Sequence, residues 1–312
     1  MKEQCRKTSI GGQALIEGIM MLGPEKSAIA IRKADGEIDC KVEPLKTLRK
    51  RFRIFRIPFI RGIIGMFDSM RLGFAAINYS ASFAIDEIEE EPSKFETWLN
   101  EKIGSKAVEN ILLGIAGVFG VVIPVVLFVL LPTLIAGMLD GVIGAGFLRN
   151  LLEGVVRIAI FLLFMLSVSR MKDMKRVFSY HGAEHKSIYC YEAGKELTVE
   201  NVRAFPKEHP RCGTSFLFSV MIVSILVFSI VQWSNPLIRM ALRLVLLPVV
   251  IGISFEVNRL IGRYDNWFTK LMRAPGVWFQ GFTTFEPDDS MIEVAISALK
   301  AVIPEEEGAD KW

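Results

Sequence analysis

The segment Tyr180–Tyr191, YHGAEHKSIYCY, contains two of the three histidines of this chain, His181 and His185. Residues four positions apart lie on one face of a helix, one turn from each other. Both imidazoles can therefore reach a single Zn²⁺ ion, whose nitrogen ligands lie about 2.0–2.1 Å from it. Glu184 completes an H-x-x-E-H string, the inverted zinc-protease motif, in which the carboxylate activates water. We predict Glu184 as the catalytic base.

The third histidine, His209, lies in the segment HPRCGTS, three residues before Cys212. Both residues come just before an apolar run, so they and the helical pair can meet at one level close to the membrane. Imidazole and thiolate suit zinc, whereas Mg²⁺ prefers oxygen ligands. We predict one Zn²⁺ ion bound by His181, His185 and His209, with Cys212 as a fourth ligand or as a neighbour of the site.

Three interpretations of this group stay open. Three protein ligands and a water would make a catalytic centre, and four protein ligands would close a structural one. The third interpretation is that His181 and His185 only pack on their helix, each with a hydrogen bond.

The Gly-rich segment SIGGQALIEGIMMLGP, residues 9–24, lacks the Lys-Ser/Thr that follows the glycines of a phosphate-binding loop. Gln13 and Glu17 are four positions apart within it. The segment is either a tight turn that packs against the membrane region or a source of a further carboxylate, Glu17, for the histidine site.

Of the 312 residues, 51% are hydrophobic, and the mean hydropathy is +0.38. Apolar runs of about 18 residues or more indicate membrane-spanning helices. We predict a mainly α polytopic membrane protein with four transmembrane helices, a small N-terminal β-rich cytosolic unit and amphipathic interfacial helices. The predicted spans are Ile111–Leu139, Leu151–Ser169, Gly213–Gln232 and Pro236–Phe255.

The segment between the second and third spans, Arg170–Arg211, holds nine Lys or Arg residues, whereas the connection around Asn235 holds none. Basic loops stay on the cytoplasmic side. We therefore expect a multi-pass protein of the cytoplasmic membrane with both termini in the cytoplasm. This topology leaves all four cysteines as reduced thiols: Cys5, Cys40, Cys190 and Cys212.

Charged residues also fall inside the second and fourth spans: Glu153, Arg157, Arg239 and Arg243. Charges at membrane depth are costly unless they are paired or in contact with water. We favour an ion-pair clamp between helices, in which Glu153 neutralises Arg239 or Arg243, over a substrate path.

The chain divides into six predicted segments. Residues 1–44 form a β-hairpin unit around an Asp35-Gly36 turn, and residues 290–303 form a helix with a Ser290–Glu293 capping box. The segments are a cytosolic β-hairpin unit (1–44), a basic amphipathic interfacial region and linker (45–108), transmembrane helices one and two (109–169), a cytosolic His/Cys loop (170–212), transmembrane helices three and four (213–258) and a cytosolic C-terminal region (259–312).

Five blocks of the sequence carry a resemblance to a known family: GGQALIEGIMMLGP, YHGAEHKSIYCYEAG, HPRCGTSFLF, PVVIGISFEVNRL and PGVWFQGFTTFEPDDSMIEVAI. In this order, over nearly the whole chain, they resemble the YqhQ-type bacterial membrane proteins, a family of unknown function. The resemblance implies a polytopic protein of the bacterial cell membrane, and members are sometimes described as metal-dependent enzymes. The inverted zinc proteases add a distant glutamate ligand that has no counterpart here.

Three classes of function follow. The first is a membrane enzyme with a cytosol-facing His/Cys metal centre, a hydrolase of unknown substrate. The second is a non-catalytic factor for membrane-protein assembly or quality control, which implies membrane-protein partners or a homo-oligomer. The third is a small transporter.

Residues 45–84 carry eight Lys or Arg residues against one acid, Asp68, among many apolar residues. Interleaved Ile, Phe and Met favour an anionic leaflet over nucleic acid as the partner. We predict that this segment lies on the cytoplasmic leaflet without crossing it. A cysteine at Ser69 should react with an impermeant thiol reagent only from the cytoplasmic side, whereas one at Asn235 should react from outside. Labelling of the Ser69 cysteine from outside alone would contradict the prediction.

Overall fold

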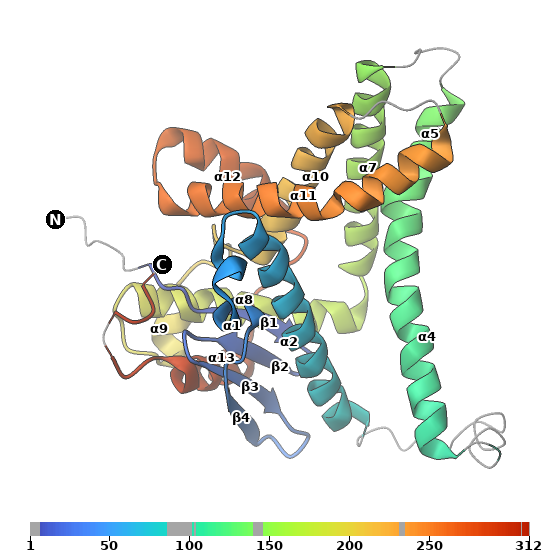
Figure 1. Ribbon diagram of the computed structural model, residues 1–312. Helices are drawn as coiled ribbons and strands as arrows, with labels where there is room; N and C mark the ends of the chain where they lie inside the picture. Colours follow the sequence, from blue (N-terminus) through green and yellow to red (C-terminus); the bar gives the residue numbers. More distant parts are fainter. Residues whose placement is uncertain are drawn as a thin grey trace. The chain divides into compact units, whose positions relative to one another are not determined.

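The computed structural model describes residues 7–85, 102, 104–139, 146–230, 235–306 and 308–311 (Figure 1). Packing divides the chain into two compact units. The first combines Met1–Ile85, Met165–Val223 and Leu247–Trp312, and the second combines Asp86–Phe164 and Ser224–Leu246. The linker expected at residues 89–96 lies outside the described residues, as does Cys5, while Cys40, Cys190 and Cys212 are free thiols.

The first unit contains an antiparallel sheet of four strands in the order β1-β2-β3-β4. The strands are β1 (Gly11–Leu15), β2 (Gly18–Leu22), β3 (Lys26–Arg32) and β4 (Ile38–Pro44). The predicted hairpin around Gly36 is confirmed, with Gly36 at φ 88°. The Gly-rich segment is a second hairpin and not merely a turn, because Leu15 pairs with Gly18 across the two residues Ile16 and Glu17. Glu17 takes the positive φ, 50°, that this tight turn requires.

The two faces of the sheet pack against different helices. Side chains alternate along β2, so Ile19 and Met21 enter one core with α8 (Lys172–Glu192) and α13 (Asp289–Val302). Met20 enters a smaller core on the other face, with Leu15 and with Ala76 of α2 (Ile60–Ile85). The sheet is therefore the middle layer of a sandwich, and α8 and α13 form its larger cover (Figure 1).

Helix α8 positions the predicted site residues. It includes the segment where the four-residue spacing of His181 and His185 predicts a helix. It is buried on most sides, and Phe178, Ala183 and Ile188 are among its buried apolar residues. It ends at Gly194, whose φ of 66° disfavours side chains other than glycine. The predicted start of α13 is wrong by two residues, because Asp288 and not Ser290 accepts the cap hydrogen bond from Met291 N.

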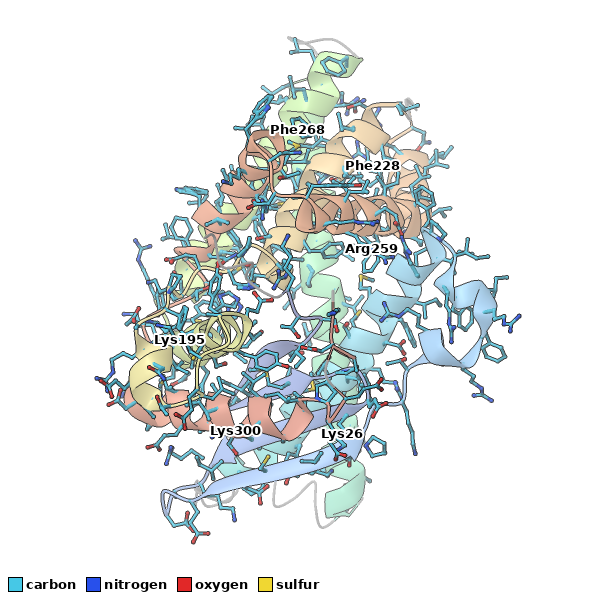
Figure 2. The ribbon with its side chains drawn as sticks, turned by 90° about the vertical axis from the view of Figure 1, so that its left-hand side faces the viewer. Lys26, Lys195, Phe228, Arg259, Phe268 and Lys300 are labelled. Atoms are coloured by element: carbon cyan, nitrogen blue, oxygen red, sulfur yellow. The ribbon has the colours of Figure 1, made fainter. Side chains whose placement is uncertain are left out.

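The basic segment begins with two short helices, α1 (Leu48–Arg51) and η1 (Arg53–Arg56), before α2. Phe52, Ile54 and Phe59 are exposed there, next to several arginines. Helix α12 (Trp267–Gln280) exposes a similar surface. Its exposed residues include Trp267, Trp278 and Phe268, which points outward in Figure 2. Both surfaces suit the interfacial helices expected from the sequence.

Four helices are long and apolar enough to cross a membrane: Gly114–Met138, Phe147–Val168, Gly213–Ile230 and Ile238–Arg263. They belong to α4 (Ser105–Val125) with η2 (Val126–Leu130) and α5 (Leu131–Met138), to α7 (Phe147–Val168), to α10 (Gly213–Ile230) and to α11 (Pro236–Arg263). Helix α2 is outside this group, and its interfacial position stays a prediction. A π-helical turn, η2, joins α4 to α5 between Pro124 and Pro132.

In the second unit the acid of α7, Glu153, pairs with two arginines. Its Oε1 accepts hydrogen bonds from Arg157 Nη2 at 3.0 Å and from Arg243 Nη1 of α11. Arg157 also donates from Nε to the Phe128 carbonyl in η2 at 2.7 Å. The Glu153 and Arg243 side chains are each only 2% exposed. Glu153 therefore pairs with Arg243, one of the two arginines predicted as its partner from the sequence.

Loss of the Glu153 charge should leave Arg157 and Arg243 buried without their counter-charge. Removing one member of a buried pair costs roughly 3–5 kcal/mol. Glu153→Gln should lower the unfolding midpoint of the detergent-solubilised protein by more than the double change Glu153→Gln with Arg243→Gln. The exposed Glu43→Gln is the control and should leave the midpoint unchanged. A double variant no more stable than the single one would show that the pair contributes nothing.

Candidate metal centre

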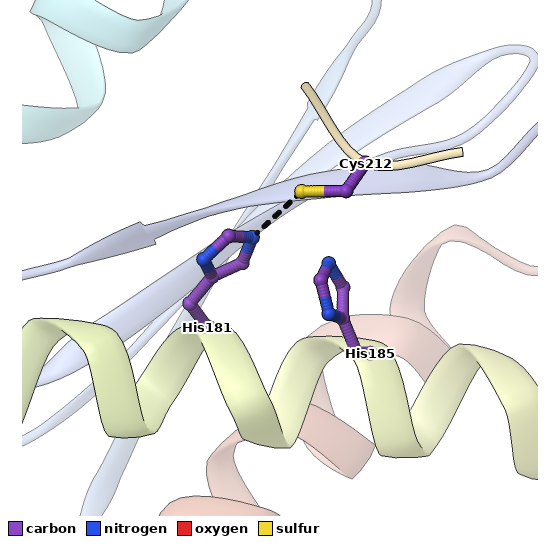
Figure 3. A group of neighbouring side chains, drawn as sticks. All are labelled: His181, His185 and Cys212. Carbon is purple, nitrogen blue, oxygen red and sulfur yellow. Dashed lines mark hydrogen bonds between the residues drawn. The ribbon is translucent and has the colours of Figure 1, made fainter. Parts of the chain in front are cut away.

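His181, His185 and Cys212 form a group that could hold a metal ion. One ligand atom from each of the three lies within 4.8 Å of the others. Both imidazoles project from the same side of α8 toward Cys212, which precedes α10 (Figure 3). His181 Nε2 lies 3.2 Å from Cys212 Sγ. Ligands of one tetrahedral Zn²⁺ ion, about 2.0–2.3 Å from it, are about 3.5 Å apart, so small side-chain rotations bring the group onto one ion.

Backbone carbonyls orient both imidazoles. His181 Nδ1 lies 2.9 Å from the Thr283 carbonyl oxygen, and His185 Nδ1 lies 2.5 Å from that of Lys207. A carbonyl only accepts, so each Nδ1 carries a proton, and Nε2 is the nitrogen that remains to bind a metal. Metal-binding histidines are commonly held in this way.

His181 and Cys212 shift each other's pKa in opposite directions. Burial by itself would lower the pKa of His181, but the adjacent Cys212 thiolate raises this pKa to about 9. Burial would raise the pKa of Cys212, but the neighbouring imidazoles of His181 and His185 hold that pKa well below its usual range. This shift favours the thiolate, which is the form that binds metal.

Glu184 lies beside this group and is buried. Its Oε1 accepts a hydrogen bond from the backbone N–H of Gly12 in β1 at 2.9 Å. Burial raises the pKa of the Glu184 carboxyl, and the two neighbouring histidines oppose that rise. A Cβ atom at Gly12 would lie 3.0 Å from Glu184 Cδ and 2.7 Å from the Met20 carbonyl oxygen, so glycine permits this approach.

The group opens onto a cavity of about 120 Å³. Its walls come from three parts of the first unit: the start of the chain with β1, helix α8 and the segment before α10. The lining residues are Ser9, Ile10, Gly11, Gly12, His181, Glu184, His185, Ile188, His209, Arg211, Cys212 and Gly213.

His209 lines the cavity, but its ring nitrogens face other partners. Its Nε2 lies 3.6 Å from Glu192 Oε2, and its Nδ1 lies 3.4 Å from the Arg211 backbone N–H. Gln280 fixes the His209 backbone with two hydrogen bonds of 2.7 Å. The geometry thus differs from the predicted ligand set, because Cys212 and not His209 joins the helical pair.

Two further sequence candidates lie outside the group. The Glu17 carboxylate forms an ion pair with Arg176 Nε at 2.5 Å and accepts a hydrogen bond from the Tyr180 hydroxyl at 3.2 Å. The Gln13 side chain lies on the α2 face, against Gly73. The proposed carboxylate contribution of Glu17 is therefore incorrect, because the turn directs Glu17 to the start of α8. Thr283 and Lys207, which orient the imidazoles, act through backbone carbonyls, for which the sequence has no signal.

These features define a membrane protein with four apolar helices and a buried His/Cys group able to hold a metal. Residues 57–305 match the family described as "Protein of unknown function (DUF1385)", and the chain belongs to that family. It is 35% identical over 296 residues to the "Uncharacterized protein YqhQ" of Bacillus subtilis (strain 168), covering 94% of this chain and 92% of the relative. No solved structure matches the chain.

Gly182 lets α8 approach the segment that orients His181. A Cβ atom at this position would lie 2.0 Å from the Phe285 carbonyl oxygen. Gly182→Ala must displace that backbone, so it should cost about 1–3 kcal/mol of stability and weaken metal binding. The control is Gly114→Ala, where a Cβ atom meets nothing within 4 Å. Unchanged melting temperature and metal content for Gly182→Ala would contradict the tight packing.

Proposed function

We propose that this protein is a zinc-dependent hydrolase of the bacterial cytoplasmic membrane, with a metal centre built from His181, His185 and Cys212. The observation that carries the proposal is the convergence of these three ligand atoms within 4.8 Å, beside the Glu184 carboxylate and open to one cavity. Three protein ligands and an open position are typical of catalytic zinc sites, whereas structural sites have four protein ligands.

The donor set suits zinc. Two imidazole nitrogens and one thiolate match a borderline-soft ion, and the low pKa of Cys212 supplies the thiolate without a large proton cost. A bound Zn²⁺ ion would polarise a substrate carbonyl and lower the pKa of coordinated water to about 7.

Glu184 has the position and environment of a general base. The Gly12 N–H fixes one carboxylate oxygen, Oε1, and leaves the other for a water molecule in the cavity. Burial brings the Glu184 pKa closer to neutral than that of an exposed carboxyl, which suits a group that takes and returns a proton near pH 7. His209 and Arg211 complete the wall, and both lie against the buried Glu192.

The topology expected from the basic residues forms part of the proposal. The Arg170–Arg211 segment and both termini would face the cytoplasm, and the centre with them. The exposed aromatic residues of η1 and its flanks, among arginines, would rest on the anionic leaflet. Membrane-protein partners and homo-oligomers are both compatible with this arrangement.

Metal analysis of the purified full-length protein tests the ligand set. We expect about one equivalent of zinc per chain, as for one mononuclear site. His181→Ala with His185→Ala, and Cys212→Ala, should each abolish binding. His209→Gln and the exposed-thiol control Cys40→Ala should retain it. Metal that survives loss of Cys212 but not of His209 would overturn the proposed ligands.

The open position can be tested without a known substrate. Cobalt in place of zinc should show a sulfur-to-metal charge-transfer band, and acetohydroxamate should shift the cobalt d–d bands. Glu184→Gln should retain the metal and its charge-transfer band. A cobalt spectrum unaffected by acetohydroxamate would mean a closed site, and the protein would then be the non-catalytic assembly factor.

A further inference from the structure

The cavity at the metal centre is walled on one side by the backbone of an edge strand. β1 is an edge strand of the sheet, and within the described part of the chain it pairs with β2 alone. Its residues Gly11 and Gly12 line the cavity together with His181, Glu184 and His185. A Cβ atom at Gly11 would meet nothing within 4 Å. At Gly11, therefore, no side chain stands between the strand and the cavity, and at Gly12 the Glu184 carboxylate does.

The direction of these groups follows from one hydrogen bond. In an antiparallel strand the N–H and C=O groups of alternate residues point to the same edge. Gly12 N donates to Glu184 Oε1, away from β2, so the main-chain groups of Ala14 also point to the outer edge. Among the described residues, the Gly12 carbonyl and the Ala14 N–H and carbonyl have no hydrogen-bond partner.

The opposite edge of the sheet, strand β4, has features that prevent pairing with another strand. β4 carries the charged residues Asp39, Lys41 and Glu43 and ends at Pro44. Charges and proline on an edge strand prevent another strand from pairing with it. β1 has the sequence GGQAL, with no charge and no proline. The edge that lacks charge and proline is the one beside the metal centre.

We propose that the substrate of this centre is an extended polypeptide segment that pairs with the outer edge of β1, next to Gly12 and Ala14. This inference rests on the proposed hydrolase function and names its substrate class. Main-chain hydrogen bonds to an exposed edge are an established mode of peptide recognition. Cys212 directly precedes α10, a candidate span, so the segment belongs to a polypeptide close to the membrane surface.

The reaction is the hydrolysis of an amide bond in that segment. The water oxygen bonds to the carbonyl carbon, and the C–N bond breaks. Glu184 accepts a proton from the water and delivers it to the leaving amine, so no further reactant is needed. Pairing with β1 holds the peptide plane in a fixed orientation, which lowers the entropic cost of reaching the transition state.

The test uses the cobalt-loaded full-length protein in detergent and three hydroxamates of equal metal affinity. One is an acetyl-tripeptide hydroxamate, the second is the same peptide N-methylated on its backbone amides, and the third is octanohydroxamate. We expect the peptide to bind about tenfold more tightly than its N-methylated form, because N-methylation removes the strand-pairing hydrogen bonds. Tightest binding of octanohydroxamate, with no effect of N-methylation, would indicate a lipid substrate and overturn the inference.

Ala14→Pro removes the outward N–H, at an edge position where proline is tolerated. It should abolish the preference for the peptide over its N-methylated form, whereas Ala14→Ser, which keeps the N–H, should retain it. Acetohydroxamate binding reports an intact centre in both variants. A preference that survives Ala14→Pro in such an intact centre would exclude pairing at β1. Failure of the wild-type cobalt protein to bind acetohydroxamate would instead overturn the proposed function itself.

Discussion

The close packing of α8 against the segment around Phe285 is the contact on which the candidate metal centre depends. Gly182 touches the Phe285 carbonyl, and the Thr283 carbonyl of the same segment holds the His181 ring. Phe285 N in turn donates to the Phe178 carbonyl, one turn earlier in α8, at 2.9 Å. The helix and the segment therefore fix each other over a short distance. An imidazole on an exposed helix would sample several rotamers, whereas here backbone groups restrict His181 to one.

Buried charge in the first unit is organised to stabilise the same helix. Lys186 of α8 is almost fully buried, and it pairs with Glu286 and donates to the Arg203 carbonyl at 3.1 Å. Glu192, near the end of α8, accepts hydrogen bonds from Arg211 and from the Thr8 N–H. Unpaired, each of these charges would be costly, because burial removes its hydration. The pairs connect α8 to the start of the chain and to the segment before α10, which line the cavity, and to the segment after α12, which orients His181.

The sequence predicted the helical pair and placed Cys212 at the site, but it made His209 a ligand and did not predict the orienting groups. His181 and His185 were accessible to prediction because the 3.6-residue period depends only on local geometry. His209 appeared equivalent to Cys212 because both precede the same apolar run, and only tertiary structure turns one ring toward Glu192. The β1–β2 hairpin was missed because its two-residue turn is Ile16-Glu17 and lacks the usual glycine or asparagine. In the spans, the charge pattern predicted a partner for Glu153 but could not choose Arg243, since that choice depends on helix rotation.

The two glycines at the start of β1 weaken the strand, but they leave space beside the cavity and Glu184. Glycine in a strand loses more entropy on folding than other residues and has no side chain to pack. Gly12 is needed because Glu184 approaches its backbone, whereas Gly11 faces open space, where a side chain would meet no obstacle. Packing therefore explains one glycine and not the other. The open space at Gly11 instead leaves room for the proposed peptide to approach β1 from the cavity, on the side where His181, His185 and Cys212 present their ligand atoms.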